Sequence, residues 1–86
     1  MGTKNNSLYM VTFTISQNVN IEVVAYNLDM FFDDMGLQFF REISGNKIEY
    51  RTLDHESYFN MQNSIYELTE RNYYAYIREI SWNNYD

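Results

Sequence analysis

An amphipathic segment from Asn20 to Met35 constrains the fold of this chain more than any other feature. Apolar residues recur in it at the spacing of one helix face, namely Ile21, Val24, Ala25, Leu28, Phe31, Phe32 and Met35. Four residues recur at the same spacing on the opposite face, namely Glu22, Tyr26, Asp29 and Asp33. The pattern predicts a helix with its apolar side against a core and an acidic outer side. Asn18 or Asn20 can cap its start, and Gly36 can end it.

The run from Leu8 to Ser16 alternates between two sets of side chains, which is typical of a half-buried strand. One set is predicted to face the helices, namely Tyr9, Val11, Phe13 and Ile15. The other set is predicted to lie on the open side of a sheet, namely Leu8, Met10, Thr12 and Thr14.

Two short aromatic and aliphatic runs follow the helix, at Leu37 to Ile43 and at Lys47 to Leu53. Ser44, Gly45 and Asn46 separate them, and these residue types suit a tight turn. The segment therefore predicts a β-hairpin.

A second helix is predicted to start at Asp54, whose carboxylate can cap it, and to end near Asn72. Its apolar stripe consists of Tyr58, Met61, Ile65 and Leu68. The stripe has helical spacing, so it predicts a second element packed on the core.

A final strand is predicted from Tyr73 to Trp82. We expect Ala75 and Ile77 to face the core, because they are the better core residues of the two alternating sets. The other set would then lie on the open side, namely Tyr74, Tyr76, Arg78, Ile80 and Trp82.

The predicted order is strand, helix, strand, strand, helix, strand. This order is that of an α+β, ferredoxin-like βαββαβ sandwich, in which two helices cover one face of a four-stranded antiparallel sheet. We expect one domain over residues 1–86, with frayed ends at 1–6 and 83–86. An apolar open face predicts self-association as a homodimer through Met10, Tyr74, Tyr76, Ile80 and Trp82.

The charge balance limits the partners of the chain. Twelve acidic residues against six basic ones give a net charge of -6, so the chain should repel nucleic acid and attract a basic protein surface. Cysteine is absent, which excludes disulfides and thiolate chemistry. The sequence has neither an apolar run long enough to span a membrane nor a signal-peptide pattern, so we expect a cytoplasmic protein without membrane contact.

No catalytic, metal-binding or cofactor-binding motif is present. Asp33 and Asp34 are adjacent, and adjacent residues on a helix point about 100° apart, so they do not converge on one ion. His55 is expected to be an exposed residue in the first turn of its helix. The third strand also lacks the motif by which RNA-recognition domains stack bases. We therefore predict no catalytic residues, no metal and no cofactor, and no enzyme activity.

The residues from Leu8 to Ser16, a helix rich in Leu, Met, Phe and Asp, and Leu37-Gln38-Phe39-Phe40 form a pattern across about the first 45 residues. This pattern resembles the start of small ferredoxin-like proteins of the CRISPR-adaptation-nuclease and GhoS-antitoxin type. The resemblance implies a dimerising ferredoxin-like scaffold. The adaptation nucleases carry an acidic residue at the end of their first strand, where this chain has Ile15-Ser16-Gln17, so the resemblance does not extend to metal-dependent cleavage.

In size and charge the chain is similar to phage-encoded anti-CRISPR and DNA-mimic inhibitors. The leading hypothesis is therefore an acidic protein-binding module from a phage or mobile element, acting in the host cytoplasm on a basic nucleic-acid-binding host protein. The carboxylates predicted to contact this partner are Glu22, Asp29, Asp33, Asp34, Glu67 and Glu70. One alternative is a GhoS-like endoribonuclease that uses Arg41, Arg51, Arg71 or Arg78, and another is a self-assembling regulatory subunit.

Overall fold

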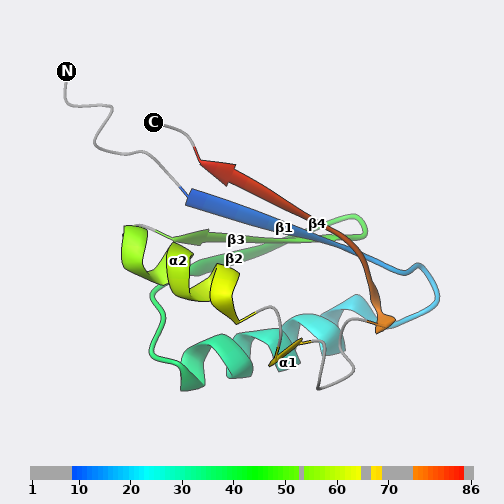
Figure 1. Ribbon diagram of the computed structural model, residues 1–86. Coiled ribbons are helices and arrows are strands. Elements are labelled where there is room, and N and C mark those ends of the chain that lie inside the picture. Colours follow the sequence, from blue (N-terminus) through cyan, green and yellow to red (C-terminus); the bar gives the residue numbers. More distant parts are fainter. Residues whose placement is uncertain (1–8, 53, 65–66, 69–74, 85–86) are drawn as a thin grey trace.

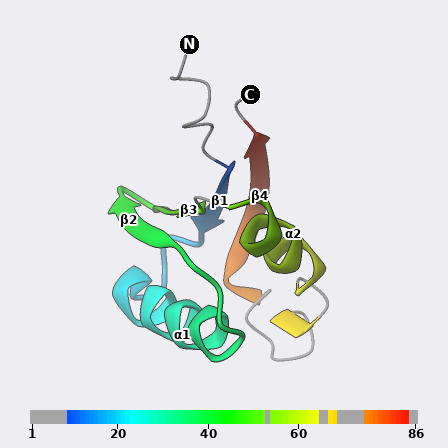
Figure 2. The ribbon, with the colours of Figure 1, turned by 90° about the vertical axis from the view of Figure 1, so that its left-hand side faces the viewer.

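The computed structural model describes residues 9–52, 54–64, 67–68 and 75–84. Its elements follow in the predicted order: β1 (Tyr9–Ile15), α1 (Ile21–Asp34), β2 (Phe40–Ser44), β3 (Lys47–Thr52), α2 (His55–Asn63) and β4 (Ile77–Asn84). The strands form one antiparallel sheet in the order β2-β3-β1-β4. Both helices lie on the same side of this sheet (Figures 1 and 2). The fold is therefore an α+β ferredoxin-like sandwich, as predicted.

Local sequence signals fix several of these boundaries. The side chain of Asn20 accepts a hydrogen bond from the backbone N–H of Glu22 at 3.0 Å, and Asp54 accepts one from Ser57 at 2.6 Å. Gly36 and Gly45 have φ angles of 77° and 64°, which side chains with a Cβ rarely adopt. Both predicted caps and the hairpin turn are thereby confirmed.

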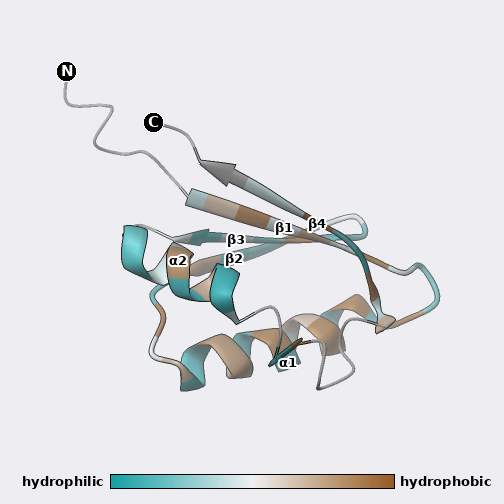
Figure 3. Cartoon of the chain, in the orientation of Figure 1, coloured by the Kyte–Doolittle hydropathy of each residue, from teal (hydrophilic) through white to brown (hydrophobic). Residues whose placement is uncertain are grey.

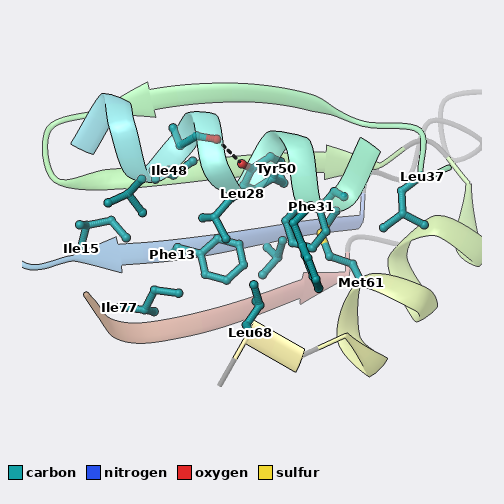
Figure 4. Packing of buried hydrophobic residues seen from close by; sticks show 14 residues of the cluster. Phe13, Ile15, Leu28, Phe31, Leu37, Ile48, Tyr50, Met61, Leu68 and Ile77 are labelled. Atoms are coloured by element: carbon teal, nitrogen blue, oxygen red, sulfur yellow. Dashed lines mark hydrogen bonds between the residues drawn. The ribbon is translucent and has the colours of Figure 1, made fainter. Parts of the chain in front are cut away.

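The core lies between the sheet and the helices. Val11, Phe13 and Ile15 of β1 are fully buried, so the predicted alternation of this strand is confirmed. They meet Leu28 and the other inward residues of α1 (Figure 4). Apolar residues are concentrated in the middle of β1 and along α1 (Figure 3). Met35 was predicted to lie on the apolar face of the helix, but it caps the end of α1 and is 40% exposed.

The second helix is shorter than predicted. It ends at Asn63, with Ser64 as its C-cap. The hydroxyl of Ser64 donates to the carbonyl of Met61 at 2.7 Å, and serine and asparagine side chains of this kind compete with helical backbone hydrogen bonds. Leu68 is nevertheless buried, because a separate short turn starts from the carbonyl of Ser64. Ile65 and Asn72 lie outside the described residues.

The predicted facing of the last strand is wrong on both sides of Ile77. Ala75, which was expected to face the core, is exposed and precedes β4. Ile77 pairs with Ile15 but Glu79 pairs with Thr14, so a bulge leaves Arg78 without a partner on β1. One extra residue moves every later side chain to the opposite face. Ile80 and Trp82 therefore pack against the core rather than on the open face.

The last strand extends to Asn84. Asn83 and Asn84 belong to β4 and pair with Met10 and Tyr9. The expected fraying of residues 1–6 and 85–86 lies outside the described residues.

Candidate protein-interaction surface

The described charges are divided between the two layers of the fold. The helix layer carries carboxylates but no lysine or arginine among the described residues, namely Glu22, Asp29, Asp33, Asp34, Asp54, Glu56 and Glu67. The strands carry both signs, namely Arg41, Lys47, Arg51 and Arg78 with Glu42, Glu49 and Glu79. The net negative charge of the described chain therefore belongs to the helix layer, so the negative potential is strongest on the helix side of the molecule.

The outer face of α1 is both acidic and apolar. We define it by Glu22, Val23, Tyr26, Met30, Asp33 and Asp34, which are all exposed. Tyr26 is 61% exposed, Val23 54% and Met30 48%. These three residues recur at i, i+3 and i+7, so they form one stripe along the helix. The face therefore combines an exposed apolar stripe, which includes an aromatic residue and a methionine of the kinds enriched at protein interfaces, with flanking carboxylates.

Asp29 does not belong to this free acidic surface. Its carboxylate accepts hydrogen bonds from Arg41 at 2.7 to 3.2 Å and from the hydroxyl of Tyr50 at 2.7 Å. The hydrogen bond from Arg41 to Asp29 raises the pKa of that arginine. Burial of Tyr50, followed by its bond to Asp29, raises the pKa of the phenol well above 10.0. Asp29 therefore links α1 to β2 and β3, and its charge is neutralised within the chain.

Asp33 and Asp34 are placed differently. They end α1, whose last turn contains no basic residue. No lysine or arginine among the described residues forms a salt bridge with either carboxylate. The C-terminal end of a helix carries partial negative charge, so two carboxylates there destabilise the helix. These residues are therefore exposed and unneutralised, at a cost to stability.

A shallow hollow of about 230 Å³ adjoins this face. It is lined by Asp29, Met30 and Asp33 of α1 and by Phe39, which precedes β2. The ring of Phe39 makes edge contacts with Phe32 at 6.1 Å and with Tyr50 at 5.2 Å. The hollow therefore combines two carboxylates, one of them neutralised, with two apolar walls.

The remaining predicted contact residues do not join this face. Glu67 is exposed, but it lies on the turn beyond α2. Glu70 and Tyr74 lie outside the described residues. Tyr76 is 43% exposed and precedes β4, whereas Met10 is half-buried. The predicted stripe for self-association is thus not continuous, since Ile80 and Trp82 face the core.

The open face of the sheet is largely polar rather than apolar. The described residues that point to it are Met10, Thr12, Thr14, Phe40, Glu42, Ser44, Lys47, Glu49, Arg51, Glu79 and Ser81. Arg51 lies 3.5 Å from Glu42 and 3.8 Å from Glu49. Among the described residues of this face, Phe40 is the one aromatic side chain.

The other candidates for chemistry are the histidine and the arginines, of which Arg71 lies outside the described residues and Arg78 is exposed. His55 is exposed at the start of α2, and its ring stacks on Phe59 at 6.3 Å and meets Tyr9 edge-on at 5.5 Å. Arg41 and Arg51 are both held by carboxylates. Among the described residues, no group of three or more His, Cys, Asp or Glu is placed to hold a metal ion.

The part of the chain described by the structure contains no helix that is long and apolar enough to cross a membrane. No protein-family model matches the sequence, and comparisons with curated proteins and with solved structures give no match either.

Proposed function

We propose that this chain is a protein-binding module that docks the helix layer, led by the outer face of α1, onto a basic surface of a nucleic-acid-binding protein. Occupying that surface would exclude nucleic acid, so the module would act as an inhibitor of the DNA-mimic or anti-CRISPR type, in the cytoplasm of a host cell. The observation that carries this proposal is the pair Asp33 and Asp34. These carboxylates are exposed and unneutralised at the helix end where they are least favourable.

Two further features support the proposal. Residues that lower stability without a compensating contact commonly serve a binding function. The one-sided charge would also steer a basic partner toward the helices, because complementary fields raise association rates at low salt. The exposed stripe of Val23, Tyr26 and Met30 supplies apolar contacts that persist when salt screens the charges.

The test is capture of a partner from host lysate with three forms of the tagged protein: wild type, Asp34→Lys and Glu79→Lys. Both substitutions make the same change in net charge at exposed residues, but Asp34 lies on the helix layer and Glu79 on the open face of the sheet. Neither carboxylate forms a salt bridge with a described residue.

We expect wild type and Glu79→Lys to retain the same nucleic-acid-binding protein at low salt. Asp34→Lys should retain about tenfold less, and added nucleic acid should displace the captured protein. Equal retention by all three forms, or a captured partner that is acidic or binds no nucleic acid, would refute the proposal. The lower retention of Asp34→Lys is expected for two reasons. The substitution weakens the electrostatic attraction that speeds association, and it removes one charge contact at the interface.

A further inference from the structure

We infer that the hollow between α1 and Phe39 receives an arginine side chain of the partner. This inference rests on the proposed function, because it names the group through which the basic partner would be recognised. Three features of the hollow support this inference: the charge, the apolar walls and the rigid lining.

The charge of the hollow fits one cation. Of its two carboxylates, Asp29 is already bound by Arg41 on two oxygens. Asp33 has no cationic neighbour among the described residues. One unneutralised carboxylate therefore remains at the rim, and one positive side chain would balance it.

The walls of the hollow favour arginine over lysine. Met30 and Phe39 provide apolar surface for an alkyl stem, and Phe39 also provides an aromatic ring. A guanidinium group is planar and weakly hydrated, so it stacks on aromatic rings while it binds a carboxylate with two parallel hydrogen bonds. The compact, strongly hydrated ammonium of lysine gains less from the same surroundings.

The lining is also held in place before any partner arrives. Phe39 is fixed by edge contacts with Phe32 and Tyr50, and Asp29 is fixed by Tyr50 and Arg41. Only Met30 and Asp33 have to order when the hollow is filled. Pre-organised surfaces lose less conformational entropy on binding, so even a shallow hollow can discriminate between side chains.

The test is an NMR titration of the purified protein with hexa-arginine and with hexalysine peptides, read at the methionine methyl groups. We expect hexa-arginine to shift the Met30 methyl resonance and to bind about three- to fivefold more tightly than hexalysine. Asp33→Asn should weaken hexa-arginine binding about three- to fivefold more than Asp34→Asn, which removes the same charge outside the hollow. Phe39→Leu, which keeps an apolar wall without an aromatic ring, should reduce the preference for arginine.

Equal losses from Asp33→Asn and Asp34→Asn would overturn this inference, as would equal binding of the two peptides or an unmoved Met30 methyl resonance. Far-UV circular dichroism of each variant confirms that it is folded. The titration uses no cellular partner, so its failure would leave the proposed function standing. Conversely, failure of the capture experiment would not alter a positive titration.

Discussion

Tyr50 connects several parts of the interior. Its ring is fully buried and makes edge contacts with Phe13, Phe32 and Phe39. Its hydroxyl donates to Asp29 of α1, which in turn binds the edge strand β2. One phenol on β3 therefore ties two strands to the helix that carries the candidate surface.

Replacing Tyr50 with phenylalanine is expected to lower the free energy of unfolding by about 1–2 kcal/mol, since the substitution removes a buried hydrogen bond to a charged group. Urea unfolding measures this change. Tyr26→Phe is the matched control, because Tyr26 is 61% exposed and exposed substitutions usually change stability by less than about 0.5 kcal/mol. Equal effects of the two substitutions would show that the hydroxyl of Tyr50 contributes nothing.

Stability should also depend on this phenol at high pH. The pKa of Tyr50 is raised in the folded state above 10.0, chiefly by burial. A raised pKa means that the folded state holds its proton more tightly, so the associated stability is complete below pH 10 and is lost as the pH rises further. The free energy of unfolding should fall by about 1.4 kcal/mol per pH unit from this group. Tyr50→Phe should remove that slope, and an unchanged slope would contradict the assignment.

Sequence periodicity could place Asp29 on the outer half of its helix but could not show that its charge is neutralised. Arg41 follows it by 12 residues and Tyr50 by 21, and the return of the hairpin beside α1 brings these groups together. Asp33 lies one helical turn away and was predicted by the same pattern. Whether a carboxylate is paired or free depends on tertiary contacts, so the local spacing of residues cannot predict it.

At the scale of elements, the bulge in β4 determines which side chains of this strand face the core. Trp82→Ala is expected to lower the free energy of unfolding by about 2–3 kcal/mol, because the indole packs on the core and meets Tyr58 at 5.9 Å. Arg78→Ala, at the exposed bulge, should change it by less than about 0.5 kcal/mol. A negligible effect of Trp82→Ala would place the indole on the open face instead.

The elements themselves were largely predictable, because each depends on local signals. The alternation in β1, the caps at Asn20 and Asp54 and the turn at Gly45 all act within a few residues. The bulge at Arg78 was not predictable, since it depends on pairing with β1 rather than on the composition of β4. The early end of α2 has a local cause that the apolar stripe concealed, namely the polar residues up to Ser64.

The two ends of α1 should respond oppositely to the same charge change. Asp34→Lys is expected to raise the free energy of unfolding by about 0.3–1 kcal/mol, because a cation suits the C-terminal end of a helix. Glu22→Lys should lower it by a similar amount, since the first turn favours an anion. Thermal or urea unfolding gives both values. If Asp34→Lys is destabilising, then the carboxylate makes a stabilising contact and the argument from its unfavourable position fails.

For the molecule as a whole, the topology produces the charge separation. Two helices on one side of the sheet (Figure 2) place carboxylates that are distant in sequence, such as Asp33 and Glu56, in the same layer of the fold. The sign of the net charge was predicted from the sequence, as was the exposed position of most acidic residues of α1. The sequence could not predict that Arg51 lies near Glu42 and Glu49 on the open face, because that depends on the register of β2 and β3.

This uneven distribution predicts that salt stabilises the protein. Like charges on the helix layer repel one another in the folded state, and raising NaCl from about 10 mM to about 1 M shortens the screening length from about 30 Å to about 3 Å. The free energy of unfolding should therefore increase, by up to about 1 kcal/mol, after subtraction of what the partly exposed salt bridge between Asp29 and Arg41 loses to screening. The increase should be smaller in Asp34→Lys than in Glu79→Lys, because only the first substitution relieves repulsion within the helix layer. If the free energy of unfolding of the wild type decreases with salt, its ion pairs outweigh this repulsion. The helix layer would then have no excess negative potential to attract a basic partner.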